Sequence, residues 1–319
     1  MRLFRHHTEV PVEARGAVVA LGNFDGVHRG HQAVLGEAAR LAVQLDTTLA
    51  VLTFEPHPRE FFTPEQAPAR LTSLREKLEL FAEAGVQYAY ACHFNGRFAA
   101  VGAETFMQDI LRDALGVRAI LVGDDFRFGA GRGGTAADFA HAGFELVSLS
   151  QVELDGVRVS STAIRNALAQ GRLADAVRLL GRPYSMSGKV VHGNKLGREL
   201  GYPTANVHMR HDRPPLFGIY AVKLEGVADH ALPGVASLGI RPTIAQQQGR
   251  PTLEVHVFDF DRDIYGKHVR VHFLHKIRDE MKFPDLEELK RWIARDESAA
   301  RDYFASGADR TIAQPHACQ

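Results

Sequence analysis

The chain has 319 residues, 45% hydrophobic and 24% charged, and this balance excludes a disordered polypeptide and favours two globular domains. Lys plus Arg and Asp plus Glu each total 38, so the zero net charge gives no indication of a nucleic-acid or anionic membrane partner. Two cysteines exclude a disulfide framework, the polar start lacks a signal-peptide pattern, and no run of about 18 apolar residues predicts a membrane span.

Short apolar runs alternate with helical patterns in the first half of the chain. Val34, Ala38, Leu41 and Leu45 repeat at the spacing of one helix face, and further helices are predicted over 73–84 and 103–115. The predicted strands are 17–24, 49–54, 86–92, 118–123 and 145–149. This alternation predicts an α/β domain with a doubly wound parallel sheet, in which ligands bind beyond the carboxyl ends of the strands.

The pattern changes near residue 181. Gly, Pro and Ser cluster in 181–188 (GRPYSMSG), which is typical of a connector, so we expect domains at 1–182 and 183–319. Strands with few intervening helices are predicted over 218–224, 234–239, 252–260 and 268–277. They indicate a small antiparallel β-barrel or sandwich. A closing helix follows, with Asp285 as its N-cap and a buried stripe of Leu286, Leu289 and Ile293.

The first candidate site is GNFDGVHRGH, residues 22–31, which follows the first strand and opens the first helix. Glycines at a strand-to-helix turn allow backbone N–H groups to face an anion. His28 and His31 share one helix face and can both donate to phosphate oxygens. The predicted ATP contacts in this turn are Gly22, Asn23, Phe24 and Asp25.

A second anion site is predicted in VRVSSTAIRNAL, residues 157–168. Ser161 and Thr162 are at the start of a predicted helix. The guanidinium group of Arg165 can bind a phosphate with two N–H groups, and Arg158 lies just upstream. Taken alone, this segment is more often an ordinary helix cap. Together with the histidine turn, it predicts the other side of a triphosphate site.

A third candidate site lies in the second half, where residues 188–207 are rich in glycine. Such a loop can approach phosphates closely, although it is not a Walker A loop. Its predicted ATP contacts are Lys189, Gly193, Lys195, Gly197 and Arg198.

PTAN, residues 203–206, places Thr204 and Asn206 on one face of an extended chain, and their hard oxygens suit Mg²⁺. Taken alone, a proline-led turn is the commoner explanation. Glu254 lies on the polar face of a predicted strand with Thr252 and His256, where a carboxylate is usually just solvated. It would matter if it pointed at a hydroxyl nucleophile.

GNFDGVHRGH and SSTAIR resemble the HxGH and ISSTxxR motifs of the nucleotidyltransferase superfamily. With TFEPHP (53–58) and GDDFRFGAGRGG (123–134), the first half is similar to the adenylyltransferase module of prokaryotic bifunctional riboflavin kinase/FAD synthetases. The resemblance implies that ATP phosphates are held by His28, His31, Ser161, Thr162 and Arg165, and it also implicates His57 and Asp125. The stretch 133–143 departs from the pattern by being shorter.

The second half resembles the riboflavin kinase module of the same family, and the whole resemblance covers roughly residues 15–305. It implies that Thr204 and Asn206 coordinate Mg²⁺ and that Glu254 is the general base for the ribityl 5′-hydroxyl. In IRDEMKF, residues 277–283, it implies that Arg278 and Glu280 bind flavin.

The implied activity is ATP-dependent phosphorylation of riboflavin to FMN, followed by adenylylation of FMN to FAD and pyrophosphate. We expect small-molecule substrates, no nucleic-acid or membrane partner, a monomer or weak homo-oligomer, and a cytoplasmic location. One alternative is an adenylate-forming enzyme like the class I aminoacyl-tRNA synthetases, although a KMSKS-like loop is missing. Another is an inactive flavin-binding regulator, which would be expected to lack catalytic residues such as His28 and Glu254.

Overall fold

The computed structural model describes residues 1–193, 201–240 and 251–309. The chain divides into two compact units. The first unit contains Met1–Pro68 and Leu74–Ser160. The second contains Ser161–Gln319 and a short earlier segment, Ala69–Ser73. The compact units therefore assign residues 161–182 to the second unit, whereas the sequence placed the domain boundary after residue 182.

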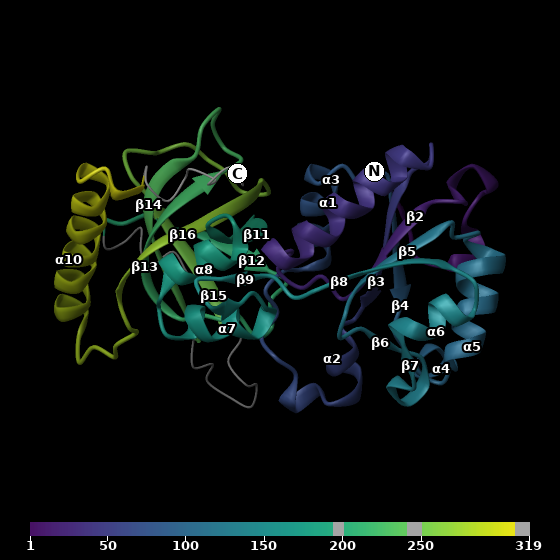
Figure 1. Ribbon diagram of the computed structural model, residues 1–319. Helices are drawn as coiled ribbons and strands as arrows, with labels where there is room; N and C mark the ends of the chain where they lie inside the picture. Colours follow the sequence, from purple (N-terminus) through teal and green to yellow (C-terminus); the bar gives the residue numbers. More distant parts are fainter. Residues whose placement is uncertain (194–200, 241–250, 310–319) are drawn as a thin grey trace. The chain divides into compact units, whose positions relative to one another are not determined.

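The first unit is built on a parallel sheet, of which β2, β3, β4, β5 and β8 are labelled in Figure 1. The sheet has six strands in the order β1-β4-β3-β2-β5-β8. The strands are β1 (Arg2–Phe4), β2 (Val18–Leu21), β3 (Leu49–Glu55), β4 (Tyr88–His93), β5 (Ala119–Gly123) and β8 (Glu145–Leu149). All five pairings are parallel. The prediction of a parallel sheet is confirmed, and only the short edge strand β1 was not expected.

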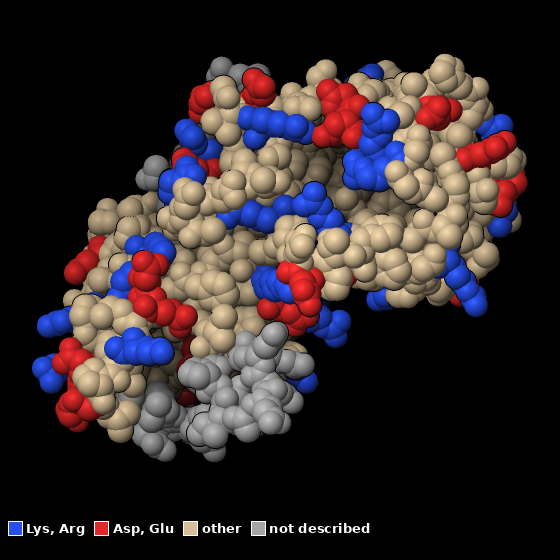
Figure 2. Space-filling view, turned by 90° about the horizontal axis from the view of Figure 1, so that it is seen from below, with Lys and Arg blue, Asp and Glu red and all other residues tan. Residues whose placement is uncertain are grey.

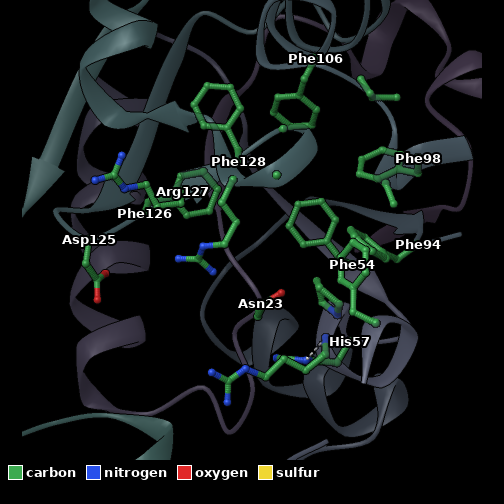
Figure 3. Close-up of a pocket in the computed structure, with 18 residues that line it drawn as sticks. Asn23, Phe54, His57, Phe94, Phe98, Phe106, Asp125, Phe126, Arg127 and Phe128 are labelled. Atoms are coloured by element: carbon green, nitrogen blue, oxygen red, sulfur yellow. Dashed lines mark hydrogen bonds between the residues drawn. The ribbon is translucent and has the colours of Figure 1, made fainter. Parts of the chain in front are cut away.

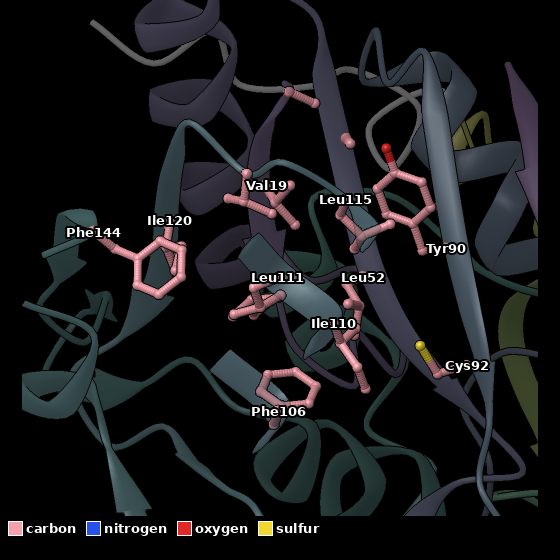
Figure 4. Close-up of a cluster of buried hydrophobic side chains, with 14 of the residues drawn as sticks. Val19, Leu52, Tyr90, Cys92, Phe106, Ile110, Leu111, Leu115, Ile120 and Phe144 are labelled. Carbon is pink, nitrogen blue, oxygen red and sulfur yellow. The ribbon is translucent and has the colours of Figure 1, made fainter. Parts of the chain in front are cut away.

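Hydrophobic clusters cover both faces of this sheet. On β2, Val18 and Ala20 pack with helices α1 (Arg29–Gln44) and α3 (Leu74–Glu83). Val19 and Leu21 face the other cluster, which includes Phe106 and Leu111 (Figure 4). The helices on that side are α5 (Ala103–Thr105), the π-helical η4 (Phe106–Ala114) and α6 (Ala136–His141). Because strand side chains alternate between faces, the apolar runs bury both sides, as a doubly wound sheet requires.

Short elements complete the first unit. The helix α6 occupies most of the shortened stretch 133–143. The other short helices and turns are η1 (His7–Glu9), η2 (Val12–Ala14), α2 (Pro58–Phe62), η3 (Pro64–Gln66), α4 (Gly96–Ala99) and η5 (Ala130–Arg132). Two small ribbons pair β6 (Arg127–Phe128) with β7 (Gly134–Thr135) and β9 (Glu153–Leu154) with β10 (Val157–Arg158).

The second unit is a closed antiparallel barrel in the order β11-β12-β15-β14-β13-β16. Its strands are β11 (Tyr184–Val191), β12 (Ala205–Met209), β13 (Gly218–Glu225), β14 (Leu232–Ile240), β15 (Pro251–Val257) and β16 (His268–Arg278). Helices α7 (Ser161–Ala169) and α8 (Leu173–Leu180) precede it, and α10 (Leu286–Ala305) follows. The predicted barrel and its closing helix, capped by Asp285, are confirmed.

Two expectations about the second unit are wrong. Residues 184–188 are not a connector but the first half of β11, with Tyr184 and Met186 buried in the barrel. Gly188 serves strand packing there, because a Cβ on it would lie 2.3 Å from the His208 carbonyl oxygen. In α10, Leu286 is 56% exposed, and the buried contact with the barrel lies around Ala300.

Lys and Arg side chains are interspersed with Asp and Glu on the face of the molecule drawn in Figure 2. This distribution agrees with the equal numbers of positive and negative residues in the chain.

Candidate active sites

The turn between β2 and α1 is held in an unusual backbone conformation. Phe24 and Val27 have φ angles of 49° and 39°, although neither is glycine. Both side chains are almost fully buried, and the Phe24 ring packs edge-on against Phe81. Such a conformation costs free energy and persists only where the surrounding structure enforces it, which is common at ligand-binding turns.

The two histidines of this turn lie against each other. His28 caps α1, and its Nδ1 accepts the backbone N–H of His31 at 3.3 Å. Their rings stack with centroids 3.6 Å apart, on one face as the spacing predicts. Because Nδ1 of His28 accepts a hydrogen bond, the proton of the neutral ring is on Nε2. In this form Nε2 can donate to a phosphate oxygen.

A cavity of about 770 Å³ opens in the same unit. Asn23 of the turn lines it, and so do His57 and Asp125, which the sequence had assigned to ATP. Phenylalanine rings form much of the wall, with Phe54, Phe94 and Phe98 grouped on the side away from Asp125 (Figure 3). The lining phenylalanines are Phe54, Phe62, Phe94, Phe98, Phe106, Phe126 and Phe128. The cavity can hold a flat aromatic ligand.

Polar groups complete the cavity wall. His57 caps α2 by accepting the Arg59 N–H at 3.1 Å. Asp125 accepts a hydrogen bond of 2.6 Å from Arg158, so two residues predicted separately for ATP form one ion pair. Both side chains are exposed, so the pair adds little stability. The cavity is also lined by Arg59, Arg127 and Arg132, which sequence reasoning missed.

Ser161 and Thr162 are the first two residues of α7, as the predicted anion site requires. Arg165 follows on the same helix, and its Nε donates to the Ala69 carbonyl oxygen at 2.6 Å. This bond fixes the guanidinium group. These residues belong to the second compact unit and His28 to the first. Their joint action on one triphosphate therefore stays a prediction.

Glu254 occupies a polar row across three barrel strands. On β15 it pairs directly with Asn206 of β12 and with Ser237 of β14. Thr204 donates from Oγ1 to a Glu254 carboxylate oxygen at 3.4 Å. The neighbours of Glu254 on its strand, Leu253 and Val255, are fully buried on the opposite face. Ser237 was not singled out from the sequence, because only the strand register brings it opposite Glu254.

The backbone at Gly193 lies close to one of the predicted magnesium ligands, Asn206. A Cβ on Gly193 would lie 2.3 Å from the Asn206 side-chain amide, so the backbone at Gly193 approaches this side chain closely. Thr204 is hydrogen-bonded to Glu254, and Asn206 is the strand partner of Glu254, so these residues offer oxygen donors of the kind that Mg²⁺ prefers. Lys189 is exposed on β11. Lys195, Gly197 and Arg198 lie outside the described residues.

The two predicted flavin-binding residues have well-defined partners. Arg278 forms a bidentate ion pair with Asp296 of α10, with distances of 2.8 and 2.6 Å. Glu280 lies so close to Gly239 that a Cβ there would overlap its carboxylate. Burial raises the pKa of Glu280, while a hydrogen bond from the Ile240 backbone lowers it. Glu280 is therefore seated at the end of β14.

Comparison with known proteins places these sites in a family. The family model described as FAD synthetase matches residues 10–163, and the one described as riboflavin kinase matches residues 180–304. A bifunctional riboflavin kinase/FMN adenylyltransferase of Escherichia coli strain K12 is 47% identical over 309 residues, which cover 95% of this chain and 98% of the relative. One of Pseudomonas fluorescens is 46% identical over 97% of this chain and all of the relative.

A solved structure from Streptococcus pneumoniae, described as a macrolide-efflux protein, has a TM-score of 0.79 and 32% identity, and covers 94% of this chain and 98% of its own. No helix in the described part of the chain is both long and apolar enough to cross a membrane. The two family models and the nearly full-length relatives agree on one assignment. The chain belongs to the family of bifunctional riboflavin kinases/FMN adenylyltransferases.

Proposed function

We propose that the barrel phosphorylates riboflavin to FMN and that the parallel-sheet unit adenylylates FMN to FAD. The two family models support this division, because the riboflavin kinase model falls on the barrel and the FAD synthetase model on the sheet. In this proposal the modules are 1–182 and 183–319. Helix α7, which belongs to the second compact unit, carries the adenylylation residues Ser161, Thr162 and Arg165. Residues of the two compact units thus serve one reaction.

In the kinase reaction, the ribityl 5′-hydroxyl attacks the γ-phosphate of ATP while Glu254 takes the hydroxyl proton, and the bond from the γ-phosphorus to the bridging oxygen breaks so that ADP leaves. Thr204 and Asn206 would hold Mg²⁺, which when bound offsets the negative charge of the phosphates. The hydrogen bond between Thr204 and Glu254 supports this assignment, because it puts the base next to the metal ligands. Lys189, Gly193, Lys195, Gly197 and Arg198 contact ATP in this proposal.

In the adenylylation reaction, the FMN phosphate is largely a dianion at neutral pH, since its second pKa is near ~6. It attacks the α-phosphate of ATP without a general base. His28 and His31 stabilise the departing pyrophosphate together with Ser161, Thr162 and Arg165. The His28 tautomer supports this role, because a ring whose Nδ1 accepts a hydrogen bond carries its proton on Nε2, which can donate.

The observation that carries the adenylylation proposal is the phenylalanine-lined cavity beside the histidine turn. Its volume of about 770 Å³ and its aromatic wall suit the isoalloxazine ring. Arg59, Arg127 and Arg132 line the same cavity and can pair with the FMN phosphate. His57, Asp125 and the Gly22–Asp25 turn would then lie between the flavin and ATP.

Further parts of the proposal concern the surroundings of these sites. Arg278 and Glu280 border the riboflavin site of the barrel, and Arg278 also anchors α10. The substrates are small molecules, and no nucleic-acid or membrane partner takes part. The chain acts as a monomer or weak homo-oligomer. Because both reactions consume ATP, we place the enzyme in the cytoplasm.

A crossed pair of variants tests the division of labour. Glu254→Gln is expected to lower FMN formation from riboflavin about 10²–10⁴-fold and to leave FAD formation from supplied FMN unchanged. His28→Ala is expected to lower FAD formation from supplied FMN and to leave FMN formation from riboflavin unchanged. Chromatographic separation of riboflavin, FMN and FAD after incubation with ATP and Mg²⁺ measures both activities. Equal losses of both activities in either variant would refute the proposed division.

A further inference from the structure

Lys77 is a lysine inside the first unit. It lies on α3 and is 1% exposed, among apolar neighbours such as Leu80 and Phe81. Lysine is almost never fully buried unless it is paired, because an ammonium group loses strong hydration. Its local sequence, SLREKLELF, is that of an ordinary amphipathic helix and gives no reason to expect a buried cation. The position of its amino group therefore needs an explanation.

The Lys77 amino group reaches the turn that carries the histidines. Its Nζ donates to the Asn23 carbonyl oxygen at 2.8 Å and lies 3.5 Å from Thr53 Oγ1. The Thr53 hydroxyl, which is fully buried on β3, donates to the same Asn23 carbonyl at 3.2 Å. Residues from α3, β3 and the turn thus meet at one backbone oxygen.

The Asn23 carbonyl oxygen belongs to the peptide group at the start of the strained turn. Asn23 lines the phenylalanine cavity, and the next residue, Phe24, is the first of the two with a positive φ. Two hydrogen bonds to the Asn23 carbonyl fix the peptide plane that enters the strained turn. The bond from Lys77 comes from α3 and the bond from Thr53 comes from β3, so two elements of the fold hold this carbonyl.

We infer that Lys77 is a positioning residue for FMN adenylylation. Its hydrogen bond to the Asn23 carbonyl holds the 22–31 turn in its strained shape. The inference rests on the proposed adenylylation site. A turn held in this shape keeps the histidines aligned for the reaction, so the effect should appear in kcat more than in KM.

Lys77→Met tests the inference, because methionine fills similar space without the charge or the donor. We expect kcat for FAD formation from supplied FMN to fall about 10²-fold, the size of effect that a small misplacement of a site can cause. KM for ATP and FMN should change by less than about threefold. Riboflavin phosphorylation, measured on the same preparation, should remain as in the wild type.

Leu80→Ala is the matched control. It lies one turn further along α3, is also buried, and removes packing without touching the Asn23 carbonyl. It should lower the melting temperature and leave kcat for FAD formation near the wild-type value. If Leu80→Ala lowers kcat as much as Lys77→Met, loosening of α3 explains the loss and the inference is wrong. The inference is equally wrong if Lys77→Met keeps kcat within about threefold of wild type.

If Lys77→Met does not fold, Lys77→Gln tests the same contact, because its shorter side chain is not expected to reach the Asn23 carbonyl at the position of the Lys77 amino group. A selective fall in kcat for FAD formation would support the inference, and an unchanged kcat would overturn it. Failure of the proposed function itself would look different, since the wild-type chain would then make no FAD from FMN.

Discussion

The ion pair between Arg278 and Asp296 ties the closing helix α10 to the end of β16, and its removal should loosen the second unit. Asp296→Ala removes the carboxylate and leaves the guanidinium group between two aromatic rings, those of Phe283 and Trp292. A buried charge without its partner is strongly unfavourable. We therefore expect this variant to destabilise the second unit selectively.

The size of the effect follows from the geometry of the pair. The two hydrogen bonds are 2.8 and 2.6 Å long, and the side chains of Arg278 and Asp296 are 15% and 9% exposed. Removing one partner of a buried pair costs about 3–5 kcal/mol. Because both side chains retain some contact with water, we expect the lower end, about 3 kcal/mol. For a domain of this size that corresponds to a fall of roughly 6–12 °C in Tm.

The chain contains one tryptophan, and it reports on this contact directly. The Arg278 guanidinium carbon lies 5.3 Å from the centre of the Trp292 ring, so urea unfolding followed by tryptophan fluorescence measures the stability of α10 on the barrel. Asp302→Ala is the matched control, because Asp302 lies on the same helix and is exposed. It should change the free energy of unfolding by less than about 0.5 kcal/mol.

A loss of less than about 1 kcal/mol in Asp296→Ala would refute the reasoning, because it would mean that the pair is screened like a surface contact. Arg278 is also a proposed flavin-binding residue. A higher KM for riboflavin at unchanged stability would assign the pair to substrate binding instead of to anchoring α10.

The other predictions concern the joint site, the boundary and the cavity. His28→Ala and Arg165→Ala should each lower FAD formation about 10²–10³-fold, and the double variant should lose less than the product of the two losses; strictly multiplicative losses would mean that the two segments act independently. A fragment of residues 161–319 should make FMN and melt at a higher temperature than one of 184–319, because α8 packs on β11 and β16; equal melting temperatures would show that α7 and α8 contribute nothing to the barrel. Phe98→Ala should raise KM for FMN in adenylylation about tenfold, roughly 1.4 kcal/mol, without affecting riboflavin phosphorylation. An unchanged KM for FMN would place the flavin outside the cavity.

Sequence patterns predict the strands and turns whose formation depends mainly on residues that are close together in the chain. The apolar runs at 17–24 and 49–54 become β2 and β3 because their buried residues serve both faces of a parallel sheet. The glycine-flanked turn of His28 forms where a strand ends and a helix begins. Glu254 lies on the polar face of its strand because Leu253 and Val255 fill the barrel.

What the sequence could not predict depends on contacts between distant segments. Residues 184–188, the first part of β11, contain Gly and Ser and therefore have the composition of a connector. They form a strand because β11 pairs with β16, as Ser187 does with Arg270, and these partners are far apart in the chain. The phenylalanine cavity likewise collects rings from several segments with no local pattern. The sequence around Lys77 is that of a solvent-exposed lysine on an amphipathic helix. Only the folded structure brings the Asn23 carbonyl to its amino group.

The short segment Ala69–Ser73 has a consequence for how the chain is synthesised. It belongs to the second unit, although it emerges from the ribosome about 90 residues before the rest of that unit begins at Ser161. It is held there by hydrogen bonds from Arg165 to Ala69 and between His211 and Arg70. The first unit can therefore complete its fold during translation while these five residues still await their partners. A pause or truncation between residues 160 and 211 would leave residues 69 and 70 without the hydrogen bonds that Arg165 and His211 provide.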